Sequence, residues 1–176
     1  KGILLTHGHE DHIGAMPFIV KKLGGKIDVY GTKLTLGLVE NKLVEHSATE
    51  FVNFVPVSDK SIVTLGDFTA EFIHVSHSVA GSSAICLRTP VGTVFHTGDF
   101  KVDYTPLGNE IMNLNRIAEI GKQGVLLLMS ESTNVEKPGY TMSESVVRDT
   151  INKVFQDAKG RRIIIATFAS NVDRLG

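Results

Sequence analysis

The sequence lacks features that several protein classes need. Its single cysteine, Cys86, cannot close a disulfide within the chain, and its neighbours Ile85 and Leu87 indicate a packed strand position rather than a reactive thiol. No run approaches the roughly 20 apolar residues of a membrane helix, and the first residues do not follow the pattern of a secretion signal. These absences favour a globular protein of the cytoplasm with no membrane partner.

The sequence also lacks an excess of positive charge. The 176 residues carry a formal net charge of −1, whereas a protein that coats nucleic acid needs many Lys and Arg contacts to phosphates. Any contact with nucleic acid must therefore be local. A chain of this length can bury a core and fits one domain. Because it starts at Lys1, without a methionine and directly before an apolar run, we expect a piece of a longer protein.

Short apolar runs alternate with segments of helical period, which predicts a layered α/β protein. Helices are expected over about residues 13–23, 32–46, 110–120 and 143–158. A capping box formed by Thr141 and Glu144 is expected to start the last helix. Strands are expected over about residues 3–6, 27–30, 125–129 and 163–167. Between residues 51 and 97, five strand-length runs separated by turn residues predict an antiparallel meander.

Four potential metal ligands crowd one short loop between an apolar strand and a helix: His7, His9, Asp11 and His12. Imidazole and carboxylate groups are ligands that Zn²⁺ prefers, and a short loop can direct them at one point with little loss of entropy. A lone His-x-His would more simply be a solvated turn, but the added Asp-His after a strand favours metal binding. Four such groups within six residues suggest more than one ion.

Two further candidates lie at strand ends, where functional side chains gather. His77 lies in a Ser-His-Ser loop between two expected strands, and Asp99 follows another strand in a His-Thr-Gly-Asp sequence. We expect the remaining histidines to have structural or supporting roles: His46, His74 and His96.

The order and setting of these residues resemble the metallo-β-lactamase superfamily, whose motif is His-x-His-x-Asp-His followed by a distant His and an Asp at strand ends. The resemblance implies an αββα sandwich, here incomplete at both ends, with a centre of two zinc ions. It implies that His7, His9 and His77 hold the first zinc. It further implies that Asp11 and His12 hold the second and that Asp99 bridges both. The superfamily's last histidine ligand, expected far downstream, is absent from this chain.

Further segments resemble the bacterial ribonuclease J family of β-CASP nucleases: residues 6–14, 95–103, 130–134, 140–144 and 166–171. In that group a second domain interrupts the lactamase fold and clamps nucleic acid over the zinc pair. The resemblance implies a partial metallo-β-lactamase domain over residues 1–167 and the start of a β-CASP domain at 168–176, where Ser170 and Asn171 would contact nucleic acid. It implies catalytic roles for Asp11, Asp99 and Glu131, and the alternative for Glu131 is an acidic residue of a surface turn.

The resemblance implies a zinc-dependent ribonuclease that acts from RNA 5′ ends, internally or both, in RNA processing and mRNA decay, and a homo-oligomer in its full-length form. Because the last ligand and most of the β-CASP domain are missing, we expect this chain alone to hold at most one zinc firmly and to be nearly inactive. Three alternatives stay open: another hydrolase of the fold such as a thioesterase or lactonase, a non-catalytic metal-binding piece, and a DNA nuclease of the β-CASP group.

Overall fold

In a computed structural model, which describes residues 1–109 and 111–167, the first part of the chain builds a parallel sheet. Its strands pair in the order β1 (Gly2–Leu4), β2 (Ile27–Gly31) and β3 (Val52–Pro56). Parallel neighbours need crossover connections. These are made by α1 (Glu10–Ile13) and α2 (Met16–Leu23), and then by α3 (Lys33–Glu45) and the 3₁₀ turn η1 (Thr49–Phe51).

Two expectations for this part were wrong. The helix expected over residues 13–23 begins only at Met16, as α2, and a separate short helix, α1, ends at Ile13. Pro17 lies in the first turn of α2, where its missing N–H leaves no helical hydrogen bond unmade. The run at residues 51–57 is not a meander strand, because β3 pairs in parallel with β2 in the first sheet. Strand-like composition does not reveal which neighbour a strand will choose.

The second sheet has the order β4-β5-β6-β7-β8. The strands β4 (Ile62–Leu65), β5 (Phe68–His74), β6 (Ser83–Thr89) and β7 (Gly92–His96) form the expected antiparallel meander. After the 3₁₀ turn η2 (Leu107–Asn109) and α4 (Leu114–Gln123), β8 (Leu127–Met129) joins β7 in parallel. α4 starts later than expected because the Asn113 side chain accepts a hydrogen bond from Arg116 N–H and caps it there.

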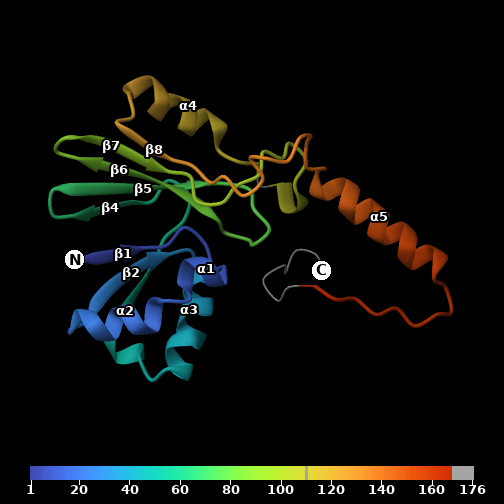
Figure 1. Ribbon diagram of the computed structural model, residues 1–176, viewed down its shortest axis with the longest axis horizontal. Helices are drawn as coiled ribbons and strands as arrows, with labels where there is room; N and C mark the ends of the chain where they lie inside the picture. Colours follow the sequence, from blue (N-terminus) through green and yellow to red (C-terminus); the bar gives the residue numbers. More distant parts are fainter. Residues whose placement is uncertain (110, 168–176) are drawn as a thin grey trace.

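The two sheets face each other, with α2 and α3 outside the first and α4 outside the second (Figure 1). Three apolar clusters fill the layers. The middle cluster joins the sheets through Tyr30, Ala70, Phe72 and Ile85. One outer cluster packs the first sheet on its helices, and the other packs the second sheet on α4 around Ile73 and Ile120. The predicted αββα sandwich is therefore confirmed.

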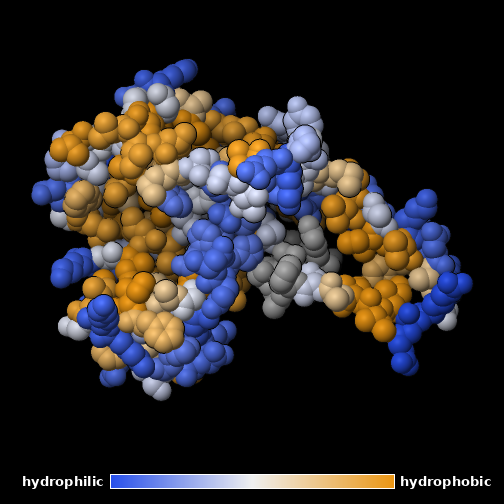
Figure 2. All heavy atoms as spheres, viewed as in Figure 1, coloured by the Kyte–Doolittle hydropathy of each residue, from blue (hydrophilic) through white to orange (hydrophobic). Residues whose placement is uncertain are grey.

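The end of the described chain departs from the sandwich. α5 (Glu144–Asp157) extends away from the sheets (Figure 1), and apolar side chains gather along it (Figure 2). Its cap is Ser143, whose Oγ accepts from Ser145 N–H, and not the expected Thr141. The strand expected at 163–167 does not form, because this segment has no neighbouring strand within the described residues. No helix in residues 1–109 and 111–167 has the length and apolar character to cross a membrane.

Candidate metal centre

Backbone hydrogen bonds hold the loop that leaves β1 against both sheets. Leu5 N–H donates to the Tyr30 carbonyl of β2 at 2.9 Å. The Thr6 carbonyl accepts from Ser83 N–H of β6, also at 2.9 Å. The loop therefore leaves the sheets from a fixed point between them. The loop and the first turn of α1 carry four of the predicted ligands: His7, His9, Asp11 and His12.

The other two predicted ligands come from neighbouring loops of the second sheet. His77 lies in the loop between β5 and β6, and Asp99 follows β7. Lys101 N–H donates to the Ser76 carbonyl at 2.7 Å, which joins the two loops directly beside both ligands. Strand pairing thus brings together residues that are far apart in the sequence.

Gly98 allows the Asp99 loop to pass close to the first ligand loop. Its φ of +58° lies in the left-handed region. A Cβ at this position would lie 2.9 Å from the Ser83 carbonyl oxygen and 3.1 Å from Thr6 Cβ. Only glycine tolerates both the left-handed φ and the lack of room for a Cβ. The position of Asp99 therefore depends on Gly98.

The ligand atoms converge from these loops. His77 Nε2 lies 3.0 Å from His9 Nδ1. Asp99 Oδ2 lies 3.8 Å from the Nε2 atoms of His7 and His77. Its other oxygen, Oδ1, lies 3.4 Å from His12 Nε2. All six predicted ligands fall into two groups that share Asp99, and within each group the ligand atoms lie within 4.8 Å of one another. The first group is His7, His9, His77 and Asp99, and the second is Asp11, His12 and Asp99.

His7 shows that the residues present fit a metal ion. Its side chain is fully buried, and Nε2 is the one buried side-chain nitrogen or oxygen without a hydrogen-bond partner among the described residues. Burying such an atom without a partner costs about 1–3 kcal/mol. The other ring nitrogen, Nδ1, lies 3.0 Å from Thr6 Oγ1. A proton on Nδ1 that donates to this hydroxyl leaves the Nε2 lone pair directed into the cluster, as a metal ligand requires.

The surroundings of His7 and His77 favour their neutral imidazole forms. Burial and, to a smaller extent, the neighbouring imidazoles of His12, His77 and His9 together lower the pKa of His7 to about 3. Burial also lowers the pKa of His77, assisted by His9 and opposed by the negative charges of Asp99 and Glu131. Metal ions bind the neutral form of histidine. His7 and His77 can therefore offer lone pairs without first having to lose protons near neutral pH.

The remaining predicted site residues do not join the two groups. Glu131 N–H donates to Thr97 Oγ1 at 3.2 Å, and its Oε2 accepts from Thr133 N–H at 2.9 Å, so it lies beside the centre as part of a turn. Within the described residues, neither group includes the other histidines: His46, His74 and His96. Ser170 and Asn171 lie outside the described residues.

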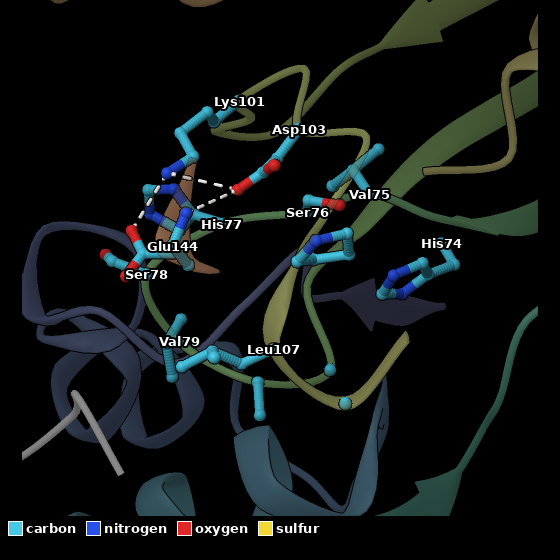
Figure 3. Close-up of a pocket in the computed structure, with 14 residues that line it drawn as sticks. His74, Val75, Ser76, His77, Ser78, Val79, Lys101, Asp103, Leu107 and Glu144 are labelled. Carbon is cyan, nitrogen blue, oxygen red and sulfur yellow. Dashed lines mark hydrogen bonds and ion pairs between the residues drawn. The ribbon is translucent and has the colours of Figure 1, made fainter. Parts of the chain in front are cut away.

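A cavity of about 300 Å³ adjoins His77 between the loop after β5 and the loop after β7 (Figure 3). On one side of it, Lys101 Nζ donates to Glu144 Oε1 at 2.8 Å and lies 3.5 Å from Asp103 Oδ2. Asp103 Oδ2 also accepts from Glu144 N–H at 2.9 Å. These contacts hold the start of α5 against the Asp99 loop. Sequence reasoning missed this role, because the three residues carry no spacing signal that links them.

The fold and the geometry together define an αββα sandwich protein with a candidate two-metal centre at one end of its sheets. Residues 1–163 match the model of the family described as the beta-lactamase superfamily domain, and the chain belongs to this superfamily. A crystal structure of a protein of unknown function from Enterococcus faecalis has the same fold, with a TM-score of 0.72 and 19% identity over 99% of this chain and 43% of that one.

Curated relatives narrow the resemblance. The chain is 43% identical over 175 residues to Ribonuclease J of Helicobacter pylori, which covers 99% of this chain and 25% of the relative. It is 44% identical over 176 residues to Ribonuclease J of a Synechocystis species, covering 99% of this chain and 27% of that relative. The expected resemblance to ribonuclease J is confirmed. The chain spans only about a quarter of the length of these relatives.

Proposed function

We propose that this chain forms the metal centre of a zinc-dependent ribonuclease that hydrolyses phosphodiester bonds in RNA. The observation that carries the proposal is the pair of ligand groups that share Asp99 around the unpartnered Nε2 of His7. RNA enters as the substrate because the chain resembles proteins named Ribonuclease J along 99% of its length. The fold alone would not choose a substrate.

The proposed ligand roles follow the two groups. His7, His9 and His77 would hold one zinc, Asp11 and His12 would hold the other, and Asp99 would contribute to both groups. A bound zinc pair supplies Lewis acidity, which lowers the pKa of the attacking water and stabilises charge on the phosphate and the leaving oxygen.

The chain's own residues would position these groups. The two oxygens of Asp99 face different ligand groups, so its carboxylate sets how far apart the groups are held. Asp11 is the most open ligand, with 78% of its side chain exposed, and would orient an attacking water. Glu131 would add negative charge beside His77, which favours cations in the centre.

The wider setting of the activity is also part of the proposal. Residues 1–167 would belong to the metallo-β-lactamase domain, and a β-CASP domain would begin at 168–176, with Ser170 and Asn171 in contact with RNA. We propose cleavage from 5′ ends, internally or both, in RNA processing and mRNA decay in the cytoplasm, by a homo-oligomer of the whole protein.

The substitution Asp99→Ala tests the assignment in the whole protein. Cleavage of single-stranded RNA should fall at least about a hundredfold, because both ligand groups lose a carboxylate. The control is Asp67→Ala, which removes an exposed aspartate from the turn between β4 and β5 and should leave the rate unchanged. Normal RNA cleavage by Asp99→Ala would refute the site.

The same preparation distinguishes the substrate classes. Turnover of a thioester, lactone or β-lactam without RNA cleavage would replace the proposed function by another hydrolase activity of this fold. Equal cleavage of DNA and RNA of one sequence would point to a nuclease that does not use the 2′-OH.

A further inference from the structure

His96 is fixed in the sheet next to the Asp99 loop. It is the last residue of β7 and pairs with Ile85 on β6 and Met129 on β8. Strands on both sides therefore hold its backbone, which fixes the point from which its half-buried side chain extends. It belongs to neither ligand group within the described part of the chain.

The His96 ring makes a specific contact with the turn that precedes Asp99. Gly98 N–H donates to His96 Nδ1 at 3.0 Å. Because Nδ1 accepts this hydrogen bond, the neutral ring carries its proton on Nε2. Thr97 Oγ1–H donates to the Gly98 carbonyl at 2.7 Å. The side chains of two successive residues thus hold both peptide groups of Gly98.

The direction of Asp99 depends on these peptide groups. The Gly98 carbonyl belongs to the peptide that joins Gly98 to Asp99, and Gly98 has a left-handed backbone, which glycine adopts without steric cost. The Asp99 oxygens must face two separate groups, with Oδ1 toward His12 and Oδ2 toward His77. A rotation of this turn would move the carboxylate away from at least one group.

We propose that His96 is a positioning residue of the metal centre: through the acceptor Nδ1 it holds the Gly98 amide, and thereby holds the Asp99 carboxylate between the two ligand groups. The inference rests on the metal centre of the proposed function but not on its RNA substrate. The positioning role differs from simple space filling beside β7, because the Gly98 amide needs the acceptor atom Nδ1 and not the bulk of the ring.

Two substitutions of His96 that differ in where they place an acceptor test the proposal. In His96→Asn, the amide oxygen is the same number of bonds from Cβ as Nδ1 and can accept from Gly98 N–H. In His96→Gln, the oxygen lies one bond further out and cannot make the same contact without shifting. Space filling alone would favour Gln, the larger side chain, whereas positioning favours Asn.

Zinc affinity is measured by competition with a chromophoric chelator, with no RNA present. We expect the affinity of His96→Gln to fall at least about tenfold, in the range found when partners of metal ligands are removed, and that of His96→Asn to stay near the unchanged protein. Hydrogen exchange of the Gly98 amide provides a second readout. It should be slow in the unchanged protein and in His96→Asn, and faster in His96→Gln.

The outcomes are separable from the proposed function. Equal affinity loss and equally fast Gly98 exchange in both variants, or no loss in His96→Gln, would overturn the positioning role. If His96→Gln does not fold, retained affinity and slow exchange in His96→Asn support the role, and their loss overturns it. An unchanged protein that binds no zinc would refute the metal centre itself, whatever the Gly98 amide does. Zinc binding without RNA cleavage would refute only the substrate.

Discussion

Replacing the buried charge of Glu71 should weaken the fold that carries the metal centre. Glu71 lies on β5 with 2% of its surface exposed. Its carboxylate accepts from Arg116 of α4, with Nε at 2.6 Å and Nη2 at 3.0 Å, and from Arg88 Nη1 of β6 at 3.0 Å. One side chain thus links two strands to the helix that covers them. His77 lies three residues after the end of β5, so the same strand leads to the site.

The expected loss for Glu71→Gln is about 2–3 kcal/mol in the free energy of unfolding. Removing one partner of a fully buried ion pair costs about 3–5 kcal/mol. Here the side chains of Arg88 and Arg116 keep 34% and 27% of their surface exposed and regain water, which reduces the loss. Glutamine also keeps the shape of the side chain and one acceptor oxygen. The expected loss of unfolding free energy is therefore closer to that of a single hydrogen bond to a charged group.

Glu119→Gln is the matched control, because Glu119 pairs with the same Arg116 at 2.6 Å but is 59% exposed. An exposed helix pair contributes less than about 0.5 kcal/mol. Urea unfolding followed by circular dichroism at about pH 7 measures both variants. Equal losses in Glu71→Gln and Glu119→Gln would refute the argument that burial decides the energy.

The pH dependence gives a second check on Glu71. The hydrogen bond from Arg116 outweighs burial and lowers the pKa of Glu71 below its ordinary value of 4.5. A carboxyl with a lowered folded pKa contributes stability that is complete above the unfolded value and lost as pH falls through the folded value. The difference between the unchanged protein and Glu71→Gln should therefore be constant from neutral pH to about 5 and shrink at lower pH. A difference that persists to about pH 2 would contradict this assignment.

Two further predictions concern the metal centre. Gly98→Ala should lower the free energy of unfolding by about 2–4 kcal/mol and weaken zinc binding, since it adds both a strained φ and a Cβ 2.9 Å from the Ser83 carbonyl oxygen. Gly66→Ala, with a φ of +64° and no atom near its Cβ, should cost only about 1 kcal/mol and leave zinc binding intact, so equal effects would exclude the clash. Zinc titration of this chain should reveal one firm ion, in the group that contains His7, His9 and His77, because three imidazoles already supply the protein ligands that one zinc needs. Two equally tight ions after dialysis would show that the Asp11, His12 and Asp99 group is closed by another residue.

Local chemistry made much of the site predictable. The four ligands near the N-terminus lie within six residues, so their grouping needs no knowledge of the fold. The period of the apolar residues predicted a layered α/β protein, and the resemblance to the superfamily implied the αββα order of the layers. Prediction failed where pairing with another strand decides the structure. β3 joined β2 in the first sheet instead of the meander, and residues 163–167 formed no strand. Ser143 in place of Thr141 as the cap of α5 is a similar case, because Ser143 is also held by the Thr105 carbonyl.

The sequence by itself determined which residues have the chemistry to bind metal and which strand ends present them. Only the tertiary structure decided that His9 and His77, 68 positions apart, lie 3.0 Å from each other, and that Nε2 of His7 is buried without a partner. It also decided that the two oxygens of Asp99 face different ligand groups. The physical reason is that these distances arise where two sheets pack and their loops meet, and a residue's type and spacing along the chain carry no information about that meeting.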